Sequence, residues 1–140
     1  MSVPDYVLDT NVISALMRRH EGARAALYRA LDLGATVYLC PVVRYEVLRG
    51  LICRDARSQM GELVHLIGVL ERDAVHDADW DLAARLWADS VRSGRPHDDA
   101  DLLIAAFAIN RSATLVTNNA ALFAHLPVST ESWLEAAPAP

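Results

Sequence analysis

The fold of this chain is constrained most by an alternation between short stretches of β-forming residues and longer segments with helical periodicity. The short stretches cover residues 5–9, 36–40, 72–76, 113–117 and 126–130. Helical segments lie between them at residues 11–19, 22–34, 41–55, 58–71, 78–94 and 99–111. Strands that alternate with helices pair in parallel, because each helix carries the chain back across the sheet. The sequence therefore predicts an α/β fold in three layers, with a central, mostly parallel sheet of about five strands flanked by helices.

Residues with special backbone preferences mark several helix ends. Gly34 and Gly94 follow periodic segments, and both suit the left-handed conformation that ends many helices. Pro41 fits the first turn of a helix, and Ser58 fits an N-cap position. These residues mark the boundaries of the predicted elements. The sequence contains no linker and no internal repeat.

The composition indicates one globular domain, since 53% of the 140 residues are hydrophobic and 22% are charged. We expect a single domain over residues 1–140, with its core in residues 4–134 and a frayed tail at 135–140. No apolar run is long enough for a bilayer and the N-terminus does not resemble a signal peptide, so we expect a cytoplasmic protein with no membrane partner. We also expect Cys40 and Cys53, which lie in apolar segments, to be reduced, buried and without a catalytic role.

The charged residues exclude several functions. A formal net charge of −5 argues against a protein that coats nucleic acid by bulk electrostatics. All 13 basic residues are arginine. The absence of lysine excludes a phosphate-loop lysine, a Schiff-base lysine and a lysine nucleophile.

Four residues with oxygen donors stand where strands end or helices begin. Asp9 closes the first strand, and Glu46 lies one turn into the helix that follows the second. Asp101 is in the first turn of the last long helix, and Asn119 follows the fourth strand. In a parallel sheet these points form the ligand crevice, so the four side chains are candidate site residues.

Each of these positions also has a purely structural interpretation. Asp9 could cap the following helix, and Glu46 could be a solvated helix residue. Asn119 could be an ordinary turn residue. For Asp98 and Asp99 we favour helix capping, because carboxylates stabilise the positive end of a helix.

Asp101 is harder to explain in this way. Ala105 and Ala108 lie one and two turns further along and are small, so this face of the helix can approach the sheet closely. A carboxylate pressed toward the strand ends needs a positive partner, which could be an arginine or a divalent metal ion. Two or three carboxylates with an amide oxygen suit Mg²⁺, or Mn²⁺ in its place, better than Zn²⁺. A hard ion at such a site favours hydrolysis of a phosphodiester.

Four motifs carry a resemblance to a known family. "VLDTNVI", the glutamate of "VVRYEVLRG", "DADLLIAAFA" and "LVTNNAALF" occur in the order and spacing of the PIN-domain ribonucleases. The chain most resembles the VapC-type toxins of type II toxin–antitoxin systems. The resemblance runs from about Val7 to about Phe123, nearly the whole chain.

The resemblance implies a role for each matching residue. Asp9 and Asp101 would be the principal metal-binding carboxylates, and Glu46 would be the third acidic member. Asn119 stands where many relatives carry an aspartate, so the site could hold one or two ions. Asn11 and Thr117 match polar positions near the site; the family role is not carried over to Asp98 and Asp99, although either could contact a water bound to the metal.

The resemblance also implies partners: a VapB-like antitoxin that covers the site, an RNA substrate, and assembly as a homodimer or a toxin–antitoxin hetero-oligomer. A candidate docking surface is the apolar pair of helices in residues 42–70, although these could simply pack as a helical hairpin.

Several arginines could contact RNA phosphates, namely Arg44, Arg49, Arg92 and Arg95. Arg95 is the most suggestive, since it leads into the helix of Asp101. His97 could assist with a proton or a phosphate contact. The sequence shows no base-stacking platform with several aromatic residues, so the RNA target cannot be read from it.

The main hypothesis is a Mg²⁺-dependent endoribonuclease that acts as a toxin. A PIN-domain nuclease in RNA processing and a catalytically silent partner-binding module are the alternatives. A phospho-acceptor domain or a haloacid-dehalogenase-type phosphatase would need a lysine, and the phosphatase would also need an aspartate where Asn11 stands.

Overall fold

The computed structural model describes residues 3–135. A five-stranded sheet forms its centre, in the order β3-β2-β1-β4-β5, and every neighbouring pair of strands is parallel. The strands are β1 (Asp5–Leu8), β2 (Val37–Leu39), β3 (Glu71–Arg72), β4 (Ala113–Val116) and β5 (Thr130–Glu131). The predicted α/β fold is therefore confirmed, and the sheet is entirely parallel.

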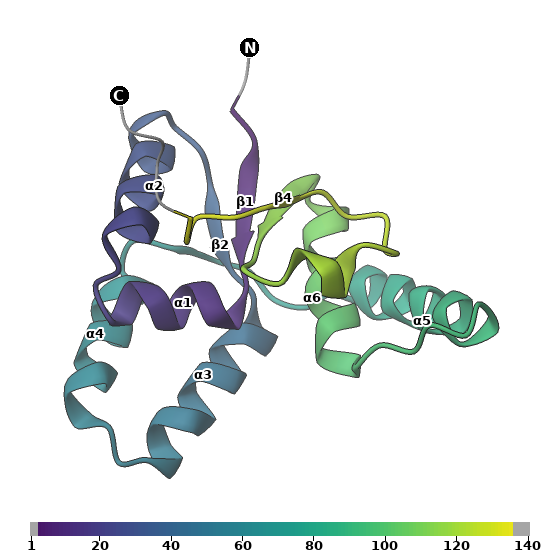
Figure 1. Ribbon diagram of the computed structural model, residues 1–140, viewed down its shortest axis with the longest axis horizontal. Coiled ribbons are helices and arrows are strands. Elements are labelled where there is room, and N and C mark those ends of the chain that lie inside the picture. The colour runs from purple at the N-terminus through teal and green to yellow at the C-terminus, as the bar shows by residue number, and fades with distance from the viewer. Residues whose placement is uncertain (1–2, 136–140) are drawn as a thin grey trace.

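Two helices lie between each strand and the next from β1 to β4. They are α1 (Thr10–Met17), α2 (Glu21–Asp32), α3 (Pro41–Cys53), α4 (Arg57–Ile67), α5 (Asp77–Arg92) and α6 (Asp99–Asn110), and a 3-10 turn, η1 (Ala120–Phe123), precedes β5. In Figure 1, α1, α2 and α4 lie to one side of the strands and α5 and α6 to the other. No helix in residues 3–135 combines the length and the apolar character needed to span a bilayer.

The core surrounds β1 and α6. Val7 and Leu8 of β1 are fully buried, because this strand has a neighbour on each side and helices on both faces. Along α6, Ala105, Phe107 and Ala108 are also fully buried, and the helix is apolar on nearly all sides. Such a helix is enclosed between other elements, which here are α5 and the sheet. The first turn of α6, which contains Asp101, is thereby held in place.

The two edge strands are shorter than predicted. Instead of a strand over residues 72–76, only Glu71–Arg72 pairs with β2, because the chain then turns away toward α5. Instead of a strand over 126–130, only Thr130–Glu131 pairs with β4. The Val128 amide instead donates to the Leu126 carbonyl at 2.8 Å, in a tight turn.

Other sequence predictions need smaller corrections. Helix α4 begins at Arg57 after Ala56, so Ser58 lies inside the helix and is not its N-cap. Cys53, the last residue of α3, is exposed, contrary to our prediction. Cys40 is buried as expected, and burial raises the pKa of its thiol to about 11. Of the predicted tail, residues 136–140 lie outside the described residues.

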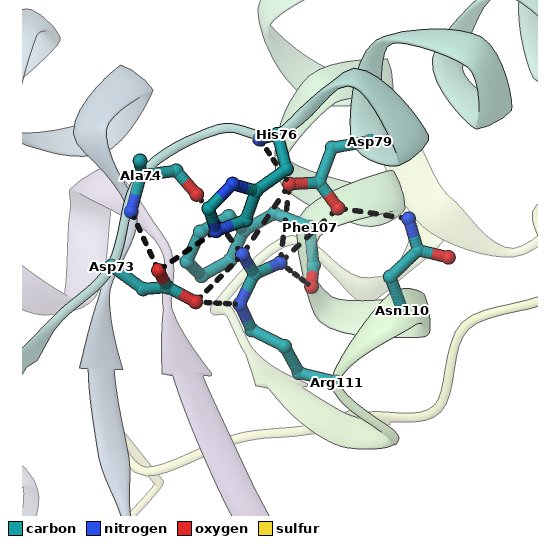
Figure 2. Close-up of polar contacts among 7 residues, drawn as sticks. All are labelled: Asp73, Ala74, His76, Asp79, Phe107, Asn110 and Arg111. Carbon is teal, nitrogen blue, oxygen red and sulfur yellow. Dashed lines mark hydrogen bonds and ion pairs between the residues drawn. The ribbon is translucent and has the colours of Figure 1, made fainter.

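An arginine whose side chain is only 10% exposed, Arg111, fixes the other end of α6 (Figure 2). Arg111 donates from Nη1 to Asp79 Oδ1 at 3.2 Å and from Nη2 to Asp73 Oδ2 at 2.9 Å. Its guanidinium carbon lies 3.5 Å from the centre of the Phe107 ring, and Asn110 donates to Asp79 Oδ1 at 2.8 Å. These contacts tie the end of α6 to the loop after β3 and to the first turn of α5.

The cluster stabilises both carboxylates in the ionised form. Burial opposes ionisation of Asp79, but hydrogen bonds from Asn110, the His76 amide and Arg111 outweigh it and hold the pKa below its usual value. The hydrogen bond from Arg111, followed by that from His76, lowers the pKa of Asp73. This cluster could not be predicted from the sequence, because its members come from three separate segments.

We predict that Arg111→Ala lowers the free energy of unfolding by about 3–5 kcal/mol, because it leaves the buried Asp79 carboxylate without its charged partner. Urea unfolding at neutral pH measures the change. Arg92→Ala is the matched control: Arg92 pairs with Asp89 at 2.7 Å, but both side chains are well exposed, so a loss below about 0.5 kcal/mol is expected. Equal losses for the two variants would contradict a structural role for the cluster.

Candidate active site

The site lies where the strand order reverses. The chain leaves β1 toward β2 and β3 and then returns to β4 on the other side of β1. In open α/β sheets, ligands bind outside the carboxyl ends of the strands at such a switch point. Asp9 directly follows β1, and Thr117 directly follows β4. Both are among the few polar residues that are buried in the described chain.

Asp9 is held on both of its carboxylate oxygens. Oδ1 accepts the Thr10 amide at 2.8 Å, so Asp9 is the N-cap of α1. Oδ2 accepts the Thr117 hydroxyl at 2.8 Å and the Asn11 side-chain amide at 3.4 Å. The Asp9 side chain is 6% exposed, yet a carboxylate has about four lone-pair positions, so it keeps acceptor capacity for a further ligand. The structural interpretation as a cap and the functional one are therefore compatible.

Thr10 connects Glu46 to this site. Its hydroxyl donates to Glu46 Oε1 at 2.8 Å, across 36 positions of sequence. Glu46 Oε2 lies 3.8 Å from Arg49 Nη2, which is one turn further along α3. Thr10 was not among the residues singled out in the sequence, because a threonine beside a helix cap gives no signal that its hydroxyl reaches a different helix.

Asp101, in the first turn of α6, faces the other acidic side chains. Burial, followed by the nearby charges of Asp9, Asp98 and Glu46, raises the pKa of Asp101 to about 6. No ion pair among residues 3–135 includes Asp101 or Asp9. Arg49 lies near Glu46, but among the described residues no basic side chain pairs with Asp9 or Asp101, and such uncompensated carboxylates are typical of functional sites.

Asp98 and Asp99 lie at the start of α6, and Asn119 precedes η1. Asp98 occupies the N-cap position of α6, as predicted, and its charge suits the positive end of the helix, but its side chain accepts no capping hydrogen bond. Asp99 is exposed in the first turn. Asn119 is exposed as well, and its backbone amide donates to the Thr117 hydroxyl at 3.0 Å, which fixes Asn119 relative to Asp9.

In the described chain, Arg44, Arg95 and His97 make no hydrogen bond or ion pair with the acidic residues of the site. Arg95 is exposed and contacts His125 Nδ1 through Nη1 at 2.9 Å. His97 has both ring nitrogens buried without a hydrogen-bond partner in the described chain. Arg44 is exposed near the start of α3. None of these contacts assigns a catalytic role to the residue.

The donor set fits a hard divalent ion through two carboxylates. Within residues 3–135 no three side chains of His, Cys, Asp or Glu are already gathered as metal ligands. Magnesium usually binds through only one or two carboxylates and keeps several waters. Asp9 and Asp101 can supply those two carboxylates, and the repulsion that raises the pKa of Asp101 is what a cation would relieve.

The sequence matches the PIN domain family over residues 6–128, which is most of the chain. The chain belongs to the PIN domain family. This match confirms the resemblance found in the four motifs, all of which lie within the matched part. No curated protein matches the sequence of this PIN domain.

Solved structures share the architecture of this PIN domain. VapBC2 from Rickettsia felis, bound to a DNA fragment from its promoter, is 25% identical, with a TM-score of 0.85, and the match covers 91% of this chain and 98% of that one. VapBC-5 from Mycobacterium tuberculosis, a member of the VapBC family of toxin–antitoxin systems, is 28% identical, with a TM-score of 0.65, 92% coverage of this chain and 98% of that one. A DNA-bound VapBC from Salmonella typhimurium is 22% identical, with a TM-score of 0.83 and coverage of 94% and 99%; this likeness supports the fold alone.

We predict that Asp101→Asn stabilises the protein in EDTA at pH 7, by about 1 kcal/mol, because it removes repulsion that is partly screened by water. The native Asp101 carboxyl holds its proton up to a pKa of about 6, above the ordinary value of 3.8. Between these values the folded state binds more protons than the unfolded state, so wild-type stability falls as pH rises through this window. The asparagine variant lacks this fall.

Thermal unfolding between pH 4 and pH 7 measures the effect, with the exposed Asp81→Asn variant of α5 as the control. A variant at position 101 that is less stable than the wild type at pH 7 would show that Asp101 is paired with a positive charge.

Proposed function

We propose that this PIN domain is a Mg²⁺-dependent endoribonuclease that hydrolyses RNA phosphodiester bonds. The observation that carries the proposal is the cluster of acidic residues at the switch point of the sheet, where burial and the charges of Asp9, Asp98 and Glu46 raise the pKa of Asp101. Membership of the PIN domain family supports a nuclease.

In this proposal Asp9 and Asp101 hold the ion, and Mn²⁺ can replace Mg²⁺. When bound, the ion supplies Lewis-acid chemistry: it lowers the pKa of a bound water and neutralises negative charge on phosphate oxygens. Glu46, positioned by the Thr10 hydroxyl, lies beside these carboxylates and can accept a proton from an attacking water. The Thr117 hydroxyl keeps Asp9 in one orientation.

Asn119 limits the charge of the site. It lies near Thr117 through its backbone, and its side-chain amide can contact a substrate or a water but contributes no charge. A second ion would therefore be held by fewer charges than the first. We propose one firmly bound ion, with a second one recruited together with the substrate phosphates.

We predict that the purified chain cleaves RNA with Mg²⁺ or Mn²⁺ and that EDTA abolishes cleavage. Asp9→Asn and Asp101→Asn should each lower the rate by at least about 100-fold, because a metal ligand is lost. Cleavage of a labelled RNA, resolved on a gel, measures the rate. The exposed aspartate variant Asp81→Asn should cleave as the wild type does.

Unchanged cleavage by both ligand variants would show that the carboxylates are not the site. No cleavage by the wild type, together with no Mn²⁺ binding by calorimetry, would favour a catalytically silent partner-binding module.

We propose further that the chain is the toxin of a VapBC-type toxin–antitoxin module, acts in the cytoplasm and is covered by a VapB-like antitoxin. The similarity to VapBC structures supports this role. The α3–α4 hairpin also exposes the apolar side chains of Ile52 and Val64, at 63% and 67%. Such a surface fits an antitoxin or a second copy of the toxin.

We predict that expression of the wild-type chain arrests bacterial growth and that Asp9→Asn relieves the arrest, because toxicity would depend on cleavage. Co-expression of the proposed VapB-like antitoxin should also relieve the arrest. Growth curves with matched protein levels by immunoblot measure both effects. Nuclease activity in vitro without any growth defect would instead favour a role in RNA processing.

A further inference from the structure

A hollow of about 450 Å³ lies at the carboxyl ends of β2 and β3. Its lining consists of Leu39, Pro41, Arg44, Arg72, Asp73 and Ala74. Arg72 is the last residue of β3, and Arg44 lies near the start of α3, where its amide donates to the Cys40 carbonyl at 3.0 Å. Both arginines are exposed. Two positive side chains from separate segments therefore line the same hollow.

The hollow lies on the same edge of the sheet as the candidate active site. Val7 of β1 pairs with Tyr38 of β2. The next residue of β2, Leu39, pairs with Arg72 of β3. Arg72 is therefore level with Leu8, the last residue of β1. Neighbouring strands lie about 4.8 Å apart, so two strand spacings separate these two backbone positions by about 10 Å. The arginines thus lie beside the edge at which the carboxylates gather.

The positive charge of this hollow is not neutralised by the described chain. No ion pair among residues 3–135 includes Arg44 or Arg72. Of the described residues that line the hollow, only Asp73 is acidic, and it is already engaged. Its Oδ2 accepts Arg111 Nη2 at 2.9 Å, and its Oδ1 accepts the Ala74 amide at 2.8 Å (Figure 2). Two guanidinium groups are therefore left for an anion from outside the chain.

The groove between α3 and α5 differs from the hollow in its charge. It exposes an aromatic side chain, Trp80, at 53%. Its only charged residues in the described chain are Glu46 and Arg49, which lie 3.8 Å apart and pair with each other. In a chain of net charge −5, two arginines without an acidic partner are a local exception. They distinguish the hollow at β2 and β3, and not this groove, as a site for an anion.

We propose that Arg44 and Arg72 form a subsite for backbone phosphates of the strand that the carboxylates cleave, beside the scissile bond. The subsite rests on the proposed nuclease function. A guanidinium group binds phosphate oxygens through two parallel hydrogen bonds, and such contacts position a strand without reading its sequence. The carboxylates repel a polyanion, so contacts away from them must supply the attraction that holds the strand.

The salt dependence of RNA binding tests the proposal. Fluorescence anisotropy of a labelled single-stranded RNA of about ten nucleotides is recorded with the intact chain in EDTA, from about 50 mM to about 200 mM salt. Each phosphate contact adds about 0.7 to the magnitude of the slope of log K against log salt concentration. We expect Arg44→Gln and Arg72→Gln each to reduce the slope by about 0.7, and the affinity at about 50 mM salt by about 8-fold. Arg44→Lys and Arg72→Lys keep the charge and should keep the slope.

Arg29→Gln is the matched control. Arg29 is exposed and in no ion pair of the described chain, but it lies in the last turn of α2, which leads to the amino end of β2. Its loss should leave the affinity within about twofold of the wild type, because salt screens distant charges. A second RNA of unrelated sequence should lose affinity equally in the two subsite variants. Circular dichroism shows whether each variant is folded; if one glutamine variant is not, the other decides.

Unchanged slopes for the folded glutamine variants, or an equal loss for Arg29→Gln, would overturn the proposal. An oligoglutamate peptide that binds as tightly as the RNA, and depends equally on both arginines, would also overturn it, because the hollow would then be a site for an acidic protein segment. Metal-dependent cleavage by the wild type with unchanged slopes in the variants would remove the subsite and leave the nuclease function intact. Arginine-dependent RNA binding without any metal-dependent cleavage would do the reverse.

Discussion

The hydrogen bond from the Thr117 hydroxyl to Asp9 Oδ2 joins the carboxyl ends of β1 and β4, and the arrangement of the site depends on it. It spans 108 positions of sequence and is buried, so water does not compete with it. The other oxygen of Asp9 starts α1 through the Thr10 amide, and the Thr10 hydroxyl reaches Glu46 on α3. Three elements are thus positioned around one carboxylate, which serves the fold and the proposed chemistry together.

The two acidic clusters in the interior differ in the direction in which the pKa of their central aspartate is shifted. Asp79 is surrounded by donors, above all Asn110 and Arg111, and its pKa lies below the usual value despite burial. Asp101 has acidic neighbours instead, and its pKa rises to about 6. Arg111 thus compensates the charge of Asp79, whereas no basic residue in the described chain pairs with Asp101. This contrast separates a structural cluster from a functional one better than the count of acidic residues does.

The order of elements could be predicted from the sequence, because periodicity depends on each segment alone. The extent of the edge strands could not be predicted, because an edge strand forms only where a neighbouring strand supplies hydrogen bonds. After Arg72 the chain leaves the sheet, and Asp73 binds Arg111. Motif spacing also located the four site candidates. The hydrogen bond from Thr10 to Glu46 and the exposure of Trp80 could not be predicted from the sequence, because both arise from packing between segments distant in sequence.

Helix α6 is attached at both ends, by the acidic centre at its first turn and by the Arg111 cluster just beyond its last residue. Its twelve residues therefore act as a spacer of fixed length and fixed rotation. Inserting one residue between these attachments would turn Asp101 by about 100° about the helix axis relative to Arg111. Loops elsewhere in this fold can lengthen during evolution, but this helix can change only by substitution unless one of its two attachments is given up.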